Sequence, residues 1–304
     1  MRVEKKSLCV FIHFGKQAYI PQYVKMYLNE LSAFFDQIVM VTNERSVETD
    51  FSGFNQNLST LFVENEGYDL GMFYKAFQTI DTNKYCQIAC INDSNILFNE
   101  LKPIFTWGKH SKFDFWGLID SYEKPWFSTH LDSYHIQSHF LVFNQKTILK
   151  LPAYFNSINI QAIFDEEDII KLRRIVIDKW EIGLTQFLIN EGLSNGSYID
   201  SQSYSIQHLK GKYSNVGHEL YSQLIQSGFP LIKKKIITRS NWMDVFRNGT
   251  QWENMIRRYG NQDWEIEALI QELIQIKRDS TNQNNTFQRN FLKVYNLFHR
   301  KEVA

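Results

Sequence analysis

Short apolar runs that alternate with helix-patterned segments constrain the fold of this chain more than any other feature of its sequence. Each run is rich in β-branched or aromatic residues and stops at Gly, Asn or Glu, which is typical of buried strands. The segments between them repeat apolar residues at helical spacing. This rhythm predicts an α/β fold, in which a mostly parallel sheet is flanked by helices. We expect strands at Ser7–Phe14, Gln37–Thr42, Leu61–Val63 and Tyr85–Ile91, and helices at Gln22–Phe35 and Met72–Ile80.

The pattern becomes mainly helical in the second half of the chain. Helices are expected at Asp165–Asn190, at Asp263–Arg278 and over residues 287–298. We therefore predict a sheet-containing domain over residues 1–204 and a mainly helical C-terminal extension over residues 205–304, packed on it. The last helix is basic and amphipathic, so it could rest on an anionic membrane surface, although a cap docked on the sheet is the simpler interpretation.

Charge and cysteine content exclude several classes of protein. The 33 Lys and Arg balance the 33 Asp and Glu, so there is no overall positive field to gather nucleic acid. The three cysteines cannot make a disulfide framework, which favours a reducing compartment. No apolar stretch is long enough for a signal peptide or a membrane span. We expect a cytoplasmic protein, with contact to the inner face of the membrane left open.

Two motifs follow predicted strands, where ligands of parallel sheets bind. Glycines four residues apart in Glu64–Gly71 allow the backbone to approach a ligand, and the following helix offers free N–H groups. Asp69 could accept hydrogen bonds from a nucleoside, or it could simply cap the helix. Asn92, Asp93 and Ser94 end the fourth strand, and Asp93 could hold Mg2+ or Mn2+ at a diphosphate, or form an ordinary Asx turn.

Other polar residues lie among aromatic or apolar neighbours. Asp114 and Trp116 stand in an aromatic segment suited to sugar stacking or to a buried strand, and Glu181 could be a general base or a solvated helix residue. His135, Gln137 and His139 share one face of a predicted strand, where a cleft lining is favoured over a zinc site with His130. Lys233 opens a run of three lysines that could neutralise a diphosphate or form a solvated edge.

Taken in order, these motifs resemble the rhamnan-synthesis F family of bacterial polysaccharide glycosyltransferases. The resemblance rests on Glu66–Gly71, Asn92–Ser94, Asp114–Leu118 and His135–Phe143, and is extended by Phe229–Lys233. It covers roughly residues 8–237. Within it, Trp116-Gly117-Leu118 followed by His135-Ile136-Gln137-Ser138 is the most specific part.

The resemblance implies a GT-A-like, Rossmann-type domain that transfers a sugar from a nucleotide donor, with dTDP-rhamnose first and a UDP-linked sugar next, to a cell-surface glycan or its lipid-linked precursor. The expected transfer inverts the sugar, with Asp114 or Glu181 as the catalytic base and Mg2+ or Mn2+ at Asp93. The alternative is a nucleotide- or glycan-binding domain without catalysis. Donor contacts are assigned to Asp69, Gly71, Asn92, Asp93, Ser94 and Lys233, and sugar or acceptor contacts to Trp116, His135 and Gln137.

Overall fold

A computed structural model describes residues 5–15, 19–45, 57–209, 215–238 and 251–280. Within them, eight strands form a central sheet in the order β3-β2-β1-β4-β8-β6-β7, with β9 paired to β6. Two further strands, β5 and β10, pair separately. The strands are β1 (Lys6–His13), β2 (Gln37–Thr42), β3 (Leu58–Phe62), β4 (Tyr85–Asn92), β5 (Asn95–Leu97), β6 (Phe115–Ser121), β7 (His135–Ile136), β8 (Phe140–Asn144), β9 (Asn195–Ile199) and β10 (Leu231–Lys233).

Helices connect these strands. A 3-10 turn, η1 (Thr82–Lys84), precedes β4, and a π-helical segment, η2 (Ile177–Gly183), joins two α-helices. The α-helices are α1 (Gln22–Leu31), α2 (Tyr68–Thr79), α3 (Lys102–Ser111), α4 (Gln145–Ile148), α5 (Leu151–Ser157), α6 (Ile160–Phe164), α7 (Ile169–Val176), α8 (Leu184–Asn190), α9 (Ser201–Leu209), α10 (Val216–Glu219), α11 (Tyr221–Gln226), α12 (Lys234–Thr238) and α14 (Gln251–Tyr259). Residues 266–280 are also helical.

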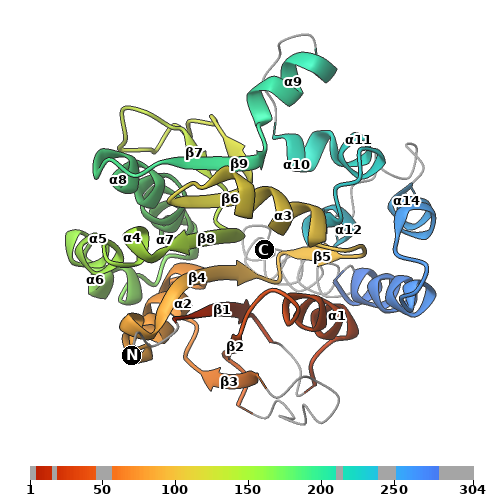
Figure 1. Cartoon of the computed structure of the whole chain (residues 1–304), viewed down its shortest axis with the longest axis horizontal. Helices are drawn as coiled ribbons and strands as arrows, with labels where there is room; N and C mark the ends of the chain where they lie inside the picture. The colour runs from red at the N-terminus through yellow and green to blue at the C-terminus, as the bar shows by residue number, and fades with distance from the viewer. Residues whose placement is uncertain (1–4, 16–18, 46–56, 210–214, 239–250, 281–304) are drawn as a thin grey trace, which may run out of the picture.

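The sheet is mostly parallel, as the strand–helix rhythm predicts. Strands β1, β2, β3 and β4 are mutually parallel. β8 runs antiparallel to both β4 and β6, so β6 has the same direction as β4. The carboxyl ends of β1, β4 and β6 therefore lie at one edge of the sheet, at His13, Asn92 and Ser121. Figure 1 shows the strands stacked from β3 at the bottom to β9 near the top.

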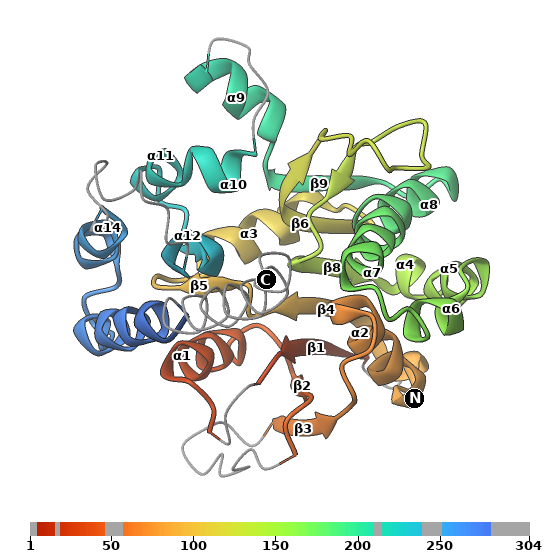
Figure 2. The same ribbon diagram turned by 180° about the vertical axis from the view of Figure 1, so that it is seen from behind.

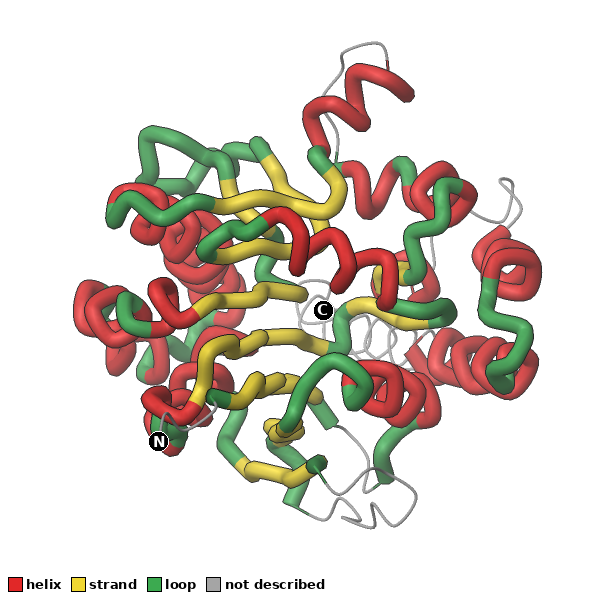
Figure 3. Tube along the Cα trace, viewed as in Figure 1, coloured by secondary structure: helices red, strands yellow, loops and turns green. Residues whose placement is uncertain are grey.

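Each face of the sheet is covered by its own set of helices. Alternate residues of β1 serve opposite faces: Cys9 and Phe11 belong to one buried cluster, and Leu8 and Val10 to another. The first cluster draws on α1, α11 and α14, and the second on α2, α5 and η2. Helices border the yellow sheet on both sides in Figure 3, and the view from behind places α7 and α8 beside β6 and β8 (Figure 2). The mixed α/β class is thus confirmed.

The C-terminal region shares a core with the rest of the chain. β10 pairs antiparallel with β5, and Leu231 and Ile232 are buried in the same cluster as Phe11 and Ile91. The expected boundary after residue 204 lies inside α9. The predicted last helix over residues 287–298, with its proposed membrane contact, lies outside the described residues. Among the helices that the structure describes, none is both long and apolar enough to cross a bilayer.

Candidate active site

A cavity of about 570 Å3 opens at the carboxyl edge of the sheet. The ends of β1, β4 and β6, the start of α2, the segment after β7, η2 and β10 all contribute to its wall. The side chains that line it include Asn65, Tyr68, Asp69, Asn92, Asp93, Ser94, Ser121, Glu123, His135, Gln137, Ser138, His139, Arg173, Glu181, Asn215 and Lys233. Most of the residues predicted from the sequence therefore meet in one place.

The loop before α2 brings Asp69 to the wall. Gly67 and Tyr68 both have left-handed backbone, with φ of 75° and 54°, which is unusual for a tyrosine and is typical of functional loops. Gly71 does not line the cavity. Its role is packing, because a Cβ there would lie 1.6 Å from the carbonyl oxygen of Glu66. Gly71, which the sequence analysis assigned to the donor, thus lets the helix approach the loop closely.

Asp69 and Asp93 stand in opposite electrostatic settings. Asp69 Oδ2 accepts hydrogen bonds from Asn92 Nδ2 at 3.1 Å and Ser138 Oγ at 3.3 Å. Burial and the nearby charge of Glu181 outweigh these bonds and raise the pKa of Asp69 to about 6. Burial would also raise the pKa of Asp93, but the Lys234 charge and hydrogen bonds from His13 and Tyr23 hold it at about 2. Asp93 is therefore ionised throughout the physiological range.

Glu181 faces the cavity from the π-helical segment η2. Its Oε2 lies 3.9 Å from His135 Nε2, and its side chain is 36% exposed. Burial raises the pKa of Glu181, while the charges of Lys233 and Arg173 oppose that rise. His135 Nδ1 donates to the carbonyl of Ser133 at 2.7 Å, and burial lowers the pKa of His135. A neutral imidazole with a free Nε2 thus stands beside the carboxylate.

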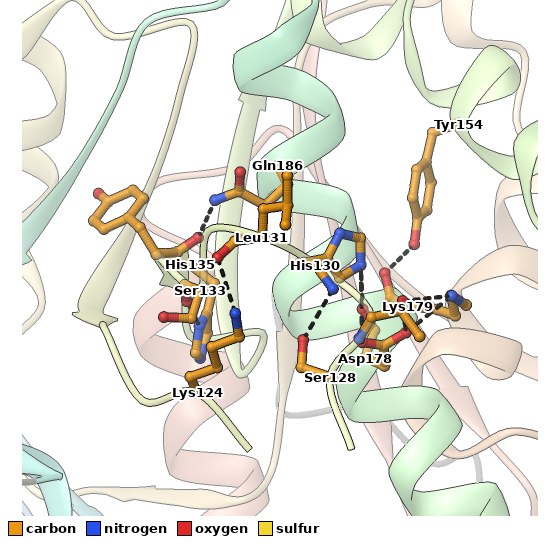
Figure 4. A network of polar contacts seen from close by, with 12 residues as sticks. Lys124, Ser128, His130, Leu131, Ser133, His135, Tyr154, Asp178, Lys179 and Gln186 are labelled. Atoms are coloured by element: carbon orange, nitrogen blue, oxygen red, sulfur yellow. Dashed lines mark hydrogen bonds and ion pairs between the residues drawn. The ribbon is translucent and has the colours of Figure 1, made fainter. Parts of the chain in front are cut away.

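A polar network holds the loop between β6 and β7 against η2 (Figure 4). His130 Nε2 donates to the carbonyl of Asp178 at 3.0 Å, and the backbone N–H of Thr129 donates to Asp178 Oδ1 at 2.8 Å. Gln186 Nε2 also donates to the carbonyl of Tyr134, the residue before His135, at 2.7 Å. The network fixes η2 and β7 relative to each other, and so fixes Glu181 relative to His135.

Asp114 and Trp116 lie away from the cavity, contrary to the roles expected for them. Asp114 precedes β6 and therefore lies at the opposite edge of the sheet from Ser121. Its carboxylate accepts from Ser194 Oγ at 2.8 Å and Asn144 Nδ2 at 3.0 Å, so it joins β6, β8 and the segment before β9. Trp116 is 4% exposed and packs on Phe105 in the core. In this protein, therefore, Trp116 packs in the core and Asp114 joins neighbouring strands.

Several site residues were not singled out individually in the sequence analysis. His13, Tyr23 and Lys234 contact Asp93, and Arg173 and Glu123 line the cavity. Two of them could have been found from the sequence: His13 ends an apolar strand, and Lys234 lies in the run of three lysines. Arg173 and Tyr23 carry no local signal, because their positions depend on how α7 and α1 pack.

The fold and the cavity define an α/β protein with a cavity at the carboxyl edge of its strands, lined by both carboxylate and cationic side chains. The chain belongs to the rhamnan synthesis protein F family, whose family model matches residues 38–299. No curated protein matches the chain.

Solved structures show weak similarity. A 4-diphosphocytidyl-2C-methyl-D-erythritol synthase from Anaerococcus prevotii is 12% identical, with a TM-score of 0.43, over 82% of this chain and 99% of that one. A protein described as a glucose-1-phosphate thymidylyltransferase from Bacillus anthracis, solved with sucrose, is 9% identical, with a TM-score of 0.41, over 64% and 86% of the two chains. A protein described as a nucleotide-diphospho-sugar transferase from Desulfovibrio desulfuricans is 10% identical, with a TM-score of 0.35, over 84% and 99%.

Proposed function

We propose that this chain is a glycosyltransferase that moves a sugar from a nucleoside diphosphate donor to a glycan acceptor. Membership of a rhamnan synthesis family supports a transferase in polysaccharide synthesis, and makes rhamnose the first sugar to test and dTDP the first nucleotide. The observation that carries the proposal is the shared cavity, where Asp69, Glu181 and Lys233 face one space. Such a space can hold a sugar between a carboxylate base and a cation for the departing diphosphate.

The transfer needs a proton acceptor, and Glu181 is the residue that we assign to it. The acceptor hydroxyl oxygen attacks the anomeric carbon and forms the new glycosidic bond, while its proton passes to Glu181. The bond between the anomeric carbon and the diphosphate oxygen breaks, and the diphosphate leaves with the electron pair. We assign the nucleoside contacts to Asp69 and Asn92 and the sugar hydroxyl contacts to His135 and Gln137, all of which line the cavity. Attack from the face opposite the diphosphate would invert the anomeric centre.

Replacing Glu181 by Gln tests the assignment. We expect the Glu181→Gln variant to lose about 10²–10⁴-fold in kcat, because the acceptor hydroxyl loses its base, while the Kd of the nucleoside diphosphate stays unchanged. In the unmodified enzyme the rate should fall as the pH drops through the raised pKa of Glu181, and this limb should vanish in the variant. Radiolabelled transfer to a glycan acceptor, with calorimetry for the nucleotide, measures both.

Two results would contradict the proposal. Full turnover of Glu181→Gln would remove this residue from the mechanism. Nucleotide binding without any transfer or slow donor hydrolysis by the unmodified protein would favour the alternative of a binding domain that has lost the chemistry.

A further inference from the structure

Three donors already bind one oxygen of Asp93, the carboxylate at the end of β4. Oδ2 accepts hydrogen bonds from the Tyr23 hydroxyl at 2.8 Å, from His13 Nδ1 at 2.9 Å and from Lys234 Nζ at 3.2 Å. The Lys234 ammonium also lies 4.7 Å from the centre of the Tyr23 ring. Burial and the Asp93 charge raise the pKa of Tyr23, so its hydroxyl remains a donor. Asp93 itself is only 8% exposed.

This arrangement does not fit a divalent cation. Mg2+ and Mn2+ take oxygen ligands from carboxylates, carbonyls, water and phosphate. The partners of Asp93 are instead an ammonium, an imidazole and a phenol, all of which act as donors toward it. Across the part of the chain that the structure describes, no group of three or more His, Cys, Asp or Glu side chains could hold a metal ion. A cation on Oδ2 would have to displace Lys234 and would be repelled by it.

The cavity has positive charge of its own. Lys233, the neighbour of Lys234, lines the cavity and donates to Gln137 Oε1 at 2.7 Å. Gly217 packs on the Lys233 side chain, since a Cβ there would lie 3.0 Å from Lys233 Cε. Arg173 lines the same space from α7. The two adjacent lysines therefore differ in position: Lys234 neutralises Asp93, and Lys233 faces the cavity.

We propose that the chain binds the diphosphate of its donor without a divalent cation, with Lys234 in the place of a metal on Asp93 and Lys233 as the cation that faces the ligand. This inference rests on the proposed function, because it presupposes a nucleotide donor. When the bond to the sugar breaks, the diphosphate gains a negative charge, and fixed cations stabilise that charge without reorganisation.

Binding by the unmodified, EDTA-treated full chain is the first test. Calorimetry with dTDP, UDP and GDP, in EDTA and again in MnCl2 or MgCl2, should give for the preferred nucleotide a Kd that differs by less than about threefold between conditions. Binding that requires the metal would overturn the inference and leave the proposed function standing. Absence of binding in every condition would contradict the nucleotide site, and with it both proposals.

Lysine variants give the second test. Lys234→Met should weaken binding in EDTA by about tenfold or more, and MnCl2 should recover part of it because Asp93 is then free to bind the metal. Lys146→Met is the matched control: Lys146 Nζ lies 3.2 Å from Asp114 Oδ1, at the opposite edge of the sheet. Equal affinities for the two variants would overturn the role of Lys234. If Lys234→Met does not fold, the inference is decided by the first test, which compares nucleotide binding by the unmodified chain in EDTA and in metal.

Discussion

The carboxyl of Asp69 lines the cavity, and its ionisation there destabilises the folded state. Its pKa of about 6 stands well above the ordinary 3.8, because burial and the charge of Glu181 disfavour the ionised form. A fully buried carboxyl with such a pKa would destabilise the folded state by about 3 kcal/mol once ionised. The Asp69 side chain is partly open to the cavity, so about 1–2 kcal/mol is the realistic cost.

Replacing Asp69 by Asn should remove that cost. Because the pKa of Asp69 is raised in the folded protein, ionising it costs nothing below pH 4, where the carboxyl is protonated in both the folded and the unfolded state. The free energy of unfolding then falls as the pH rises through about 6. At pH 8 we expect the free energy of unfolding of Asp69→Asn to exceed that of the unmodified protein by about 1–2 kcal/mol. Near pH 4 the two free energies should be equal. Urea titrations across this range measure the difference. A difference that is independent of pH would contradict the assignment.

Asp114 should behave in the opposite way. Burial would raise its pKa, but hydrogen bonds from Asn144 and Ser194 lower it below its usual value, so the ionised form stabilises the fold. Asp114→Ala should reduce the free energy of unfolding by about 2–3 kcal/mol through its lost hydrogen bonds. The Kd of the nucleoside diphosphate should not change, because the residue lies at the far edge of the sheet. If Asp114→Ala lost nucleotide binding without losing stability, Asp114 would instead belong to the nucleotide site.

The difference between Asp93 and Asp114 shows what a single sequence reveals about a site. Both carboxylates border an apolar strand, but Asp93 follows β4 and Asp114 precedes β6. The two differ only in the end of the strand that each borders, and for β4 that end was predictable from the strand–helix rhythm. The glycine of the aromatic motif is explained by packing, since a Cβ on Gly117 would lie 2.3 Å from Ile136 Cγ2. No local pattern distinguishes such packing from sugar recognition.

At the scale of elements, strand cores were predictable and their interruptions were not. β2 has the predicted bounds of Gln37–Thr42, because a continuous apolar run leaves little choice. The segment from His135 onward, expected as one strand, is divided into β7 and β8 by a turn at residues 138–139. Gln137 and His139, which lie between β7 and β8, both line the cavity. The predicted helix over residues 165–190 contains the π-helical η2, whose wider turn no apolar spacing indicated.

The loop that packs on η2 offers a test at this scale. Asp178 is buried, and its carboxylate accepts from the N–H and the Oγ1 of Thr129. Asp178→Ala should lower the free energy of unfolding by about 2–4 kcal/mol and release the loop between β6 and β7. Chymotrypsin should then cleave after Phe127, in this loop, faster than in the unmodified protein. Lys179→Met removes the Lys179 bond to Thr129 Oγ1 but keeps the two bonds from Thr129 to Asp178, so it should change stability by less than about 1 kcal/mol. Equal cleavage rates in all three proteins would contradict this role.

At the scale of the whole molecule, the C-terminal region completes both the core and the site. Trp252 and Ile256 of α14 are buried in the cluster that contains Phe11 of β1. Lys233 brings its ammonium to the cavity from β10, and Lys234 reaches Asp93 from the start of α12. The shift to a helical pattern along the chain predicted a C-terminal region that begins at residue 205. Such a pattern does not distinguish a separable domain from a layer that completes the core.

A fragment ending at residue 204 should therefore fail to fold. It would expose the partners of buried side chains such as Leu231, Ile232 and Ile256, each of which contributes about 1.5–3 kcal/mol by burial. A few such losses match the whole stability of a typical domain, about 5–15 kcal/mol. We expect the fragment to bind hydrophobic dye, to melt without a cooperative transition in circular dichroism, and to bind no nucleoside diphosphate. A cooperative transition at the temperature of the full chain would instead establish residues 1–204 as an autonomous domain, and the helical region as an addition to it.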